Sequence, residues 1–251
     1  MPCCPIKANH ISYSDTGRHT GQHTGRHTGQ HTGQHTGKHT GRHTGRHTGK
    51  QEADHTVTIW TVSREGDGFR LDAPHHSAAC LVGKAGLLPA SDKREGDMAT
   101  PLGDWPLRYV YYRPDRVTLP EINLPSIALT PSMGWCDDPD HASYNMPVDL
   151  PFAASHERLW REDGLYDLIV VLGHNDSPPR PPFGSAVFFH LREPDTAHTA
   201  GCVAVSKEDM MVLLGAADTG TILRVTHRAT HRATHRATHR ATGDNRPEGA
   251  T

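Results

Sequence analysis

The chain carries a four-residue repeat near each end, and these repeats limit how much of it can fold. Residues 19–50 are eight copies of His-Thr-Gly followed by Arg, Gln or Lys, and residues 226–241 are four copies of Thr-His-Arg-Ala. Neither repeat offers apolar side chains whose burial would offset the conformational entropy lost on ordering. We therefore predict unstructured tails at 1–50 and 225–251, with a single domain at 51–224.

Charge divides along the same boundaries. Residues 51–224 hold 14 Lys and Arg against 25 Asp and Glu, a balance of −11, whereas residues 1–50 carry +6 and residues 225–251 carry +3. The acidic domain argues against nucleic acid as its ligand, although the basic tails suit anionic surfaces. No apolar run approaches the ~18 residues of a membrane span, and the N-terminus shows no signal peptide. We expect a monomer without a membrane span.

Cysteine and histidine usage narrows the chemistry. The five cysteines are odd in number and form no C-x-x-C pair, which gives no support to a zinc ribbon or a thioredoxin-like site. The clustered imidazoles of the tails suit metal capture, yet tandem expansion of a short DNA repeat explains them more simply. No metal or cofactor is predicted for the domain itself.

The domain is expected to be mainly β, a barrel-like or sandwich fold with one or two short helices. Strands are predicted where β-branched and aromatic residues alternate or run together, at 55–62, 77–83, 107–113, 165–176 and 185–191. Proline-rich residues 177–182 must be a loop, and 114–150 is predicted to be an ordered but irregular insertion. One helix should begin at Ser206, with Asp209 completing a capping box, and a second is plausible at 155–163.

A histidine and a cysteine stand out within the β-rich part. His190 ends a predicted buried strand, and Cys202 follows Gly201 in the turn Thr-Ala-Gly-Cys. Glycine admits backbone conformations that other residues resist, so such a turn can present backbone N–H groups to an oxyanion. If His190 activates Cys202, the thiol pKa should lie below its usual ~8.5. The other reading is a buried cysteine near an unrelated histidine. Cys80 and Cys136 lack such a setting, and we expect them to be core or loop cysteines.

Three segments resemble the L,D-transpeptidase (YkuD-type) catalytic domain. His190 followed by Thr199-Ala200-Gly201-Cys202 is similar to the family's catalytic motif. SDKREGDMATPLGDWPL at 91–107 resembles its Lys-x-Gly-Asp-x-x-Thr-Pro-x-Gly element, and LIVVLGHND resembles the strand that precedes the catalytic segment in a bacterial branch. The resemblance covers roughly 56–224.

The resemblance implies acyl transfer on peptidoglycan stem peptides, without a metal or cofactor. Cys202 would attack the carbonyl of an L,D peptide bond, His190 would accept the thiol proton, and the N–H groups of Gly201 and Cys202 are candidates for the oxyanion hole. An amine acceptor would give a cross-link, and water would give carboxypeptidase activity. Thr199 and His174 are candidates for substrate contact, and His174 has a second reading as a loop residue bonded to Asp176.

Departures from the family pattern keep two other functions open. The spacing from His190 to Cys202 is short, and alanines occupy positions 200 and 204, where many members carry His and Arg or Asn. One alternative is therefore an inactive module that binds cell-wall peptide. The other is a histidine-rich metal-binding protein in which the tails are the functional part.

Overall fold

Residues 57–228 are described by the computed structural model of the protein. The predicted N-terminal tail lies outside the described residues, as does the C-terminal tail apart from 225–228, so the metal-binding reading of the tails also falls outside them. The last strand ends at Val225, one residue past the predicted end of the domain. Within residues 57–228, no helix has the length and apolar character needed to cross a membrane.

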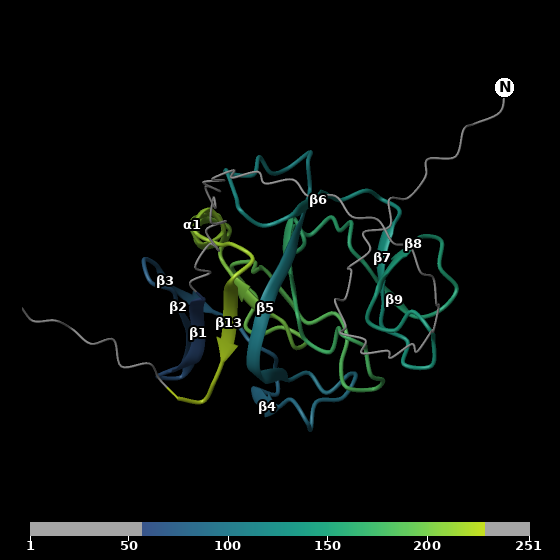
Figure 1. Ribbon diagram of the computed structural model, residues 1–251, viewed down its shortest axis with the longest axis horizontal. Helices are drawn as coiled ribbons and strands as arrows, with labels where there is room; N and C mark the ends of the chain where they lie inside the picture. The colour runs from purple at the N-terminus through teal and green to yellow at the C-terminus, as the bar shows by residue number, and fades with distance from the viewer. Residues whose placement is uncertain (1–56, 229–251) are drawn as a thin grey trace, which may run out of the picture. The chain divides into compact units, whose positions relative to one another are not determined.

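The described residues fold mainly as β-structure, as predicted, with one short helix among them. The large sheet contains ten strands: β1 (Thr58–Glu65), β2 (Gly68–Asp72), β3 (Ser77–Cys80), β4 (Leu87–Pro89), β5 (Thr100–Tyr112), β6 (Ser126–Ala128), β10 (Leu168–Leu172), β11 (Phe188–Leu191), β12 (Val203–Val205) and β13 (Thr221–Val225). Their order is β12-β11-β10-β5-β13-β1-β2-β3, and β4 and β6 also pair with β5. Figure 1 shows β5 between β13 and β1 on one side and a separate small sheet on the other.

The large sheet curls until its two ends meet, which makes it a nearly closed barrel. Leu81, the residue after β3, bridges Ala204 in β12, and each backbone N–H donates to the carbonyl of the other residue at 2.8 and 3.0 Å. A second bridge, between Gly83 and Thr199, continues this junction just beyond the two strands. The Cys202 segment therefore lies at the seam of the barrel.

Two apolar clusters lie on opposite faces of β10 and β11. Leu168 and Val170 face the first cluster, inside the barrel, whereas Ile169 and Val171 face the second. This explains why LIVVL is apolar without interruption, since both faces of the strand are covered. In β11 the same alternation sends Phe189 into the first cluster and Phe188 into the second.

The small sheet covers the second cluster from outside the barrel. It is formed by β7 (Met133–Cys136), β8 (Pro147–Asp149) and β9 (His156–Arg158), in the order β8-β7-β9. Part of the predicted irregular insertion is thus a small sheet. The helix predicted at 155–163 is wrong: His156–Arg158 pair with β7, and Leu159 is fully buried in the second cluster. Tertiary pairing here outweighs a local helix signal.

The helix predicted after Ser206 is confirmed. α1 spans Lys207–Gly215, Ser206 is its N-cap, and the Ser206 Oγ accepts the Asp209 N–H at 3.1 Å. Met210, Leu213 and Leu214 extend from α1 into the first cluster. Because the helix follows β12 directly, it anchors the strand that continues from Cys202.

Candidate active site

The turn that carries Cys202 is fixed by its own side chains. Gly201 has a φ of +146°, and a Cβ at this position would lie 3.0 Å from the Ala99 carbonyl oxygen. Both facts restrict the position to glycine. The Thr199 hydroxyl accepts the Gly201 N–H at 3.1 Å and donates to the Cys202 carbonyl at 2.7 Å. The Gly201 N–H is therefore engaged in this conformation rather than open to an oxyanion.

A second threonine holds the same turn from the opposite side. Thr100, fully buried in β5, donates its hydroxyl hydrogen toward the carbonyl oxygens of Gly201 and Cys202, at 2.8 and 3.2 Å. Its oxygen accepts the Gly83 N–H at 2.8 Å. Thr100 belongs to the segment SDKREGDMATPLGDWPL at 91–107, so this segment supports the Cys202 turn.

The same segment also places a buried charge under the turn. Lys93 is 4% exposed, and its ammonium lies 2.5 Å from an Asp97 carboxylate oxygen. Asp97 in turn accepts the N–H groups of Arg94 and Ala99. Burial opposes ionisation of Asp97, but the Arg94 N–H, the Lys93 ammonium and the Ala99 N–H together lower its pKa. This hydrogen-bonded pair holds the loop whose Ala99 carbonyl touches Gly201.

The Cys202 thiol is buried and neutral. Its S–H donates to the Ala186 carbonyl at 3.2 Å, and its sulfur accepts the Phe188 N–H at 3.3 Å. Burial raises the pKa of the thiol to about 12, with a further rise from the Glu157 carboxylate, against smaller lowering effects of the Phe188 N–H and Lys93. The expected thiol pKa below ~8.5 is therefore wrong for this resting geometry, because desolvation outweighs every stabilising contact.

His190 is also buried and neutral. Its Nδ1 lies 2.7 Å from the Leu191 carbonyl oxygen. A carbonyl can only accept, so Nδ1 carries the hydrogen, and the neutral ring keeps Nε2 free of a proton. Burial lowers the pKa of His190 to about 4, although the Leu191 carbonyl opposes that shift. The ring is thus held in a tautomer that can accept a proton at Nε2.

Cys202 and His190 share one face of two neighbouring parallel strands. Phe189 is in register with Val203, and His190 with Ala204, so Cys202 lies beside Phe188. Cys202 and His190 are therefore offset by two residues along the strand direction, which is a rise of ~7 Å. No hydrogen bond joins the sulfur to the imidazole within the part of the chain that the structure describes. Both side chains line one cavity of about 240 Å³, together with Thr199.

The cavity contains residues that the sequence did not indicate. Tyr166 packs edge-on against the His190 ring, with centroids 5.2 Å apart, and its hydroxyl donates to Glu157 Oε2 at 2.6 Å. Arg161 lies over the Tyr166 ring and pairs with Asp163. Glu157 was not predicted as a site residue because a helix was predicted at 155–163. In a strand, successive side chains point to opposite faces, so the Glu157 side chain lies on the other face from those of His156 and Arg158.

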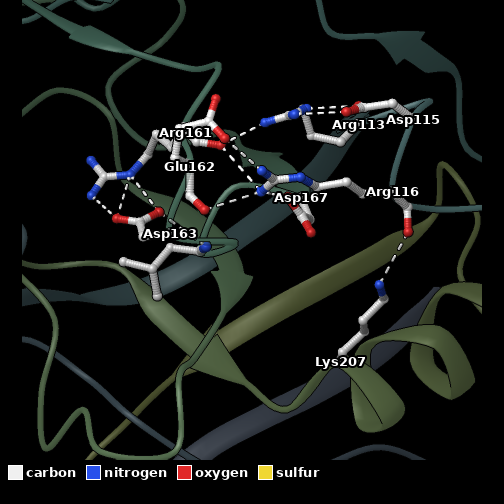
Figure 2. Close-up of polar contacts among 9 residues, drawn as sticks. Arg113, Asp115, Arg116, Arg161, Glu162, Asp163, Asp167 and Lys207 are labelled. Carbon is white, nitrogen blue, oxygen red and sulfur yellow. Dashed lines mark hydrogen bonds and ion pairs between the residues drawn. The ribbon is translucent and has the colours of Figure 1, made fainter.

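An ionic network fixes the loop that brings Tyr166 to His190. Figure 2 shows the guanidinium groups of Arg113 and Arg116 converging on the loop that carries Arg161. Arg113 donates to the Arg161 carbonyl, and Arg116 pairs with the carboxylates of Glu162 and Asp167. The loop is thereby tied to the end of β5, and Tyr166 is held in the cavity wall beside His190.

His174 is not among the residues that line the cavity. It is 5% exposed, its Nε2 contacts the Phe183 carbonyl at 3.0 Å, and its ring packs edge-on against Trp105. Its Nδ1 is buried and has no hydrogen-bond partner in the part of the chain that the structure describes. The alternative bond to Asp176 is absent among the described residues, since Asp176 pairs with Arg108. Burial lowers the pKa of His174.

Cys80 and Cys136 lie away from the candidate site. Cys80 and Cys136 are buried and free, Cys80 in the first apolar cluster and Cys136 in β7. Within residues 57–228, no group of three His, Cys, Asp or Glu side chains is arranged to hold a metal ion.

A family model and a solved structure match the chain. Residues 53–226 match the sequence model of the YkuD family, described as the L,D-transpeptidase catalytic domain. Among solved structures, L,D-transpeptidase 3 from Mycobacterium tuberculosis is matched at 11% identity and a TM-score of 0.34. The match covers 68% of this chain and 61% of that one, so the chain spans less than two thirds of that structure. No curated protein matches the chain.

Proposed function

Because the chain belongs to the YkuD family of L,D-transpeptidase catalytic domains, we propose that it transfers acyl groups of peptidoglycan stem peptides through Cys202. The observation that carries the proposal is the placement of Cys202 and His190 on one strand face, both lining the same cavity. Of the cysteines at 80, 136 and 202, only Cys202 lines that cavity, and only it follows a glycine-restricted turn.

The first half-reaction begins from a neutral thiol and a neutral imidazole. With the thiol pKa at about 12 and the imidazole pKa at about 4, an ion pair is strongly disfavoured before substrate binds. We therefore propose that the thiol proton moves to His190 Nε2 as the sulfur attacks the peptide carbonyl. The Leu191 carbonyl holds the Nδ1 hydrogen and stabilises the imidazolium that forms. His190 then protonates the leaving amine, and a thioester remains on Cys202.

The oxyanion would be bound by the backbone at the turn. The Cys202 N–H is our candidate donor. The Gly201 N–H is engaged by Thr199, so we assign Gly201 the task of shaping the turn and Thr199 the task of locking it. His174 keeps a proposed contact with substrate only if the loop at Phe183 moves.

An inactive peptide-binding module is the second candidate, and one observation favours it. The Cys202 S–H donates to the Ala186 carbonyl rather than to His190, so the S–H bond must rotate away from that carbonyl before the proton can pass to the imidazole. If that rotation never occurs, the cavity would still hold a peptide without chemistry.

Intact-mass measurement separates the two functions. The full chain is incubated with a tetrapeptide stem, and a mass increase that corresponds to the acyl group is expected on the wild type but not on Cys202→Ser. Cys80→Ser and Cys136→Ser serve as matched controls and should acylate normally. Peptide binding without any mass increase in the wild type would establish the binding module instead.

A further inference from the structure

The acidic side of the cavity carries a carboxylate that forms no ion pair within residues 57–228. Glu157 lines the cavity beside Cys202, and the one side-chain hydrogen bond that it accepts among these residues comes from the neutral Tyr166 hydroxyl. Among residues 57–228, no Lys, Arg or His side chain lies within ion-pair distance of Glu157. A half-buried carboxylate without a counter-ion is costly, so proteins normally pair such groups.

Two further carboxylates, those of Asp137 and Glu95, add negative charge near Glu157. One Asp137 oxygen is buried without a hydrogen-bond partner among residues 57–228, and Glu95 accepts the neutral hydroxyls of Tyr144 and Ser185. Burial and these two carboxylates raise the pKa of Glu157, while the Tyr166 hydroxyl and Arg161 oppose the rise. Arg161 is itself paired with Asp163. Arg161 therefore acts on Glu157 without forming an ion pair, and no cation of residues 57–228 lies in direct contact with the Glu157 carboxylate.

The strand register aims Glu157 at the nucleophile. Glu157 lies opposite Trp135 in the β9–β7 pair, and directly paired side chains point to the same face of a sheet. The Trp135 ring packs against Phe188 at 5.0 Å between centroids, and Phe188 donates its N–H to the Cys202 sulfur. Glu157 therefore faces the strand that borders Cys202, across the cavity.

We infer that Glu157 binds the primary ammonium group of the acyl acceptor beside Cys202 and takes a proton from it, which makes Glu157 a catalytic residue of the second half-reaction. This inference rests on the proposed function, because it requires the thioester on Cys202. It specifies the acceptor as a cationic amine. An ammonium would supply the missing counter-ion, and only the deprotonated amine has the lone pair needed for attack.

The proton balance of this step closes without a further reagent. The ammonium gives one proton to the Glu157 carboxylate and becomes an amine. Its nitrogen attacks the thioester carbon, forming the C–N bond, and a second proton passes from that nitrogen to His190. The C–S bond breaks as the carbonyl re-forms, and the Cys202 sulfur takes the proton from His190. Glu157 finally releases its proton to water, so the products are an amide, a neutral thiol and one proton.

Acceptors of different charge test the inference. The wild type and Glu157→Gln are acylated with the tetrapeptide stem, and decay of the acyl-enzyme is followed by mass at about pH 7. Glycinamide is mainly an ammonium at that pH, whereas hydroxylamine is mainly neutral. Loss of a general base costs about 100-fold or more. We expect that loss for glycinamide with Glu157→Gln, a change under ~3-fold for hydroxylamine, and normal acylation.

Glu121→Gln is the matched control. Glu121 is exposed and does not line the cavity, so this variant should transfer to both acceptors like the wild type. Unchanged transfer to glycinamide in Glu157→Gln would overturn the inference, as would an equal loss for both acceptors or a loss of acylation, each of which indicates a structural role. A wild type that forms no acyl-enzyme would overturn the proposed function itself.

Discussion

Replacing Thr100 with valine should loosen the Cys202 turn more than it changes the rest of the fold. Valine has nearly the same shape but cannot hydrogen-bond, so the buried Gly83 N–H loses its acceptor and the Gly201 carbonyl loses its donor. An unsatisfied buried donor costs about 1–3 kcal/mol, and a lost neutral hydrogen bond costs about 1 kcal/mol. The free energy of unfolding should therefore fall by about 2–4 kcal/mol, measured by urea denaturation.

Thr221→Val separates a local effect from a general one. Thr221 is also fully buried, and its hydroxyl exchanges hydrogen bonds with the Asp218 backbone and carboxylate, away from the Cys202 turn. If local opening of the turn becomes easier by about 1 kcal/mol of the stability lost in Thr100→Val, the population of the open turn rises about fivefold. Cys202 should then be alkylated by iodoacetamide about five times faster in Thr100→Val than in Thr221→Val. Equal alkylation rates in the two variants would refute a positioning role for Thr100.

Three further predictions follow from the same geometry. Gly201→Ala should destabilise the protein by about 1–3 kcal/mol in urea denaturation, because alanine resists a positive φ and its Cβ meets the Ala99 carbonyl; an unaltered midpoint would contradict this. The ultraviolet absorbance of the Cys202 thiolate, taken as the difference between the wild type and Cys202→Ser, should stay small up to pH 9.5, since burial raises the pKa of the thiol to about 12; a titration midpoint below pH 9 would mean a thiol that is ionised more readily. Glu157→Gln should raise the Tm at pH 8 more than at pH 5, because a carboxyl pKa raised in the folded state means that stability is lost as pH rises above the unfolded value of ~4.3. A Tm that falls more at pH 8 than at pH 5 would show that the Glu157 carboxylate supports the fold.

Local sequence patterns predicted the main elements well. The uninterrupted apolar run LIVVL indicated a strand covered on both faces, and β10 is such a strand. Ser206 and Asp209 indicated a capped helix, and both side chains form that cap. In each case the deciding interactions lie within a few residues of one another, so a short stretch of sequence contains them.

The candidate site was only partly accessible from the sequence. His190, Gly201 and Cys202 were proposed from one segment of the chain, where spacing and a glycine-dependent turn are visible. Glu157 was hidden because its segment was taken for a helix, and only the pairing of β9 with β7 directs it into the cavity. The depth of burial, which sets the pKa values of Cys202 and His190, was equally hidden, since it depends on what the rest of the chain places around them.

The sequence by itself indicated the strands β1, β3, β5, β10 and β11, the capped helix and the residues that suit acyl transfer, because alternation, capping and glycine-restricted turns depend on neighbouring residues. Only the tertiary structure decided that Thr100 hydrogen-bonds to the Cys202 turn, that His174 lies apart from the cavity, and that Glu157 faces the nucleophile. These contacts join segments up to about a hundred residues apart. A shift of one residue in strand register would turn each of these side chains to the opposite face, and register is fixed by the packing of the whole barrel.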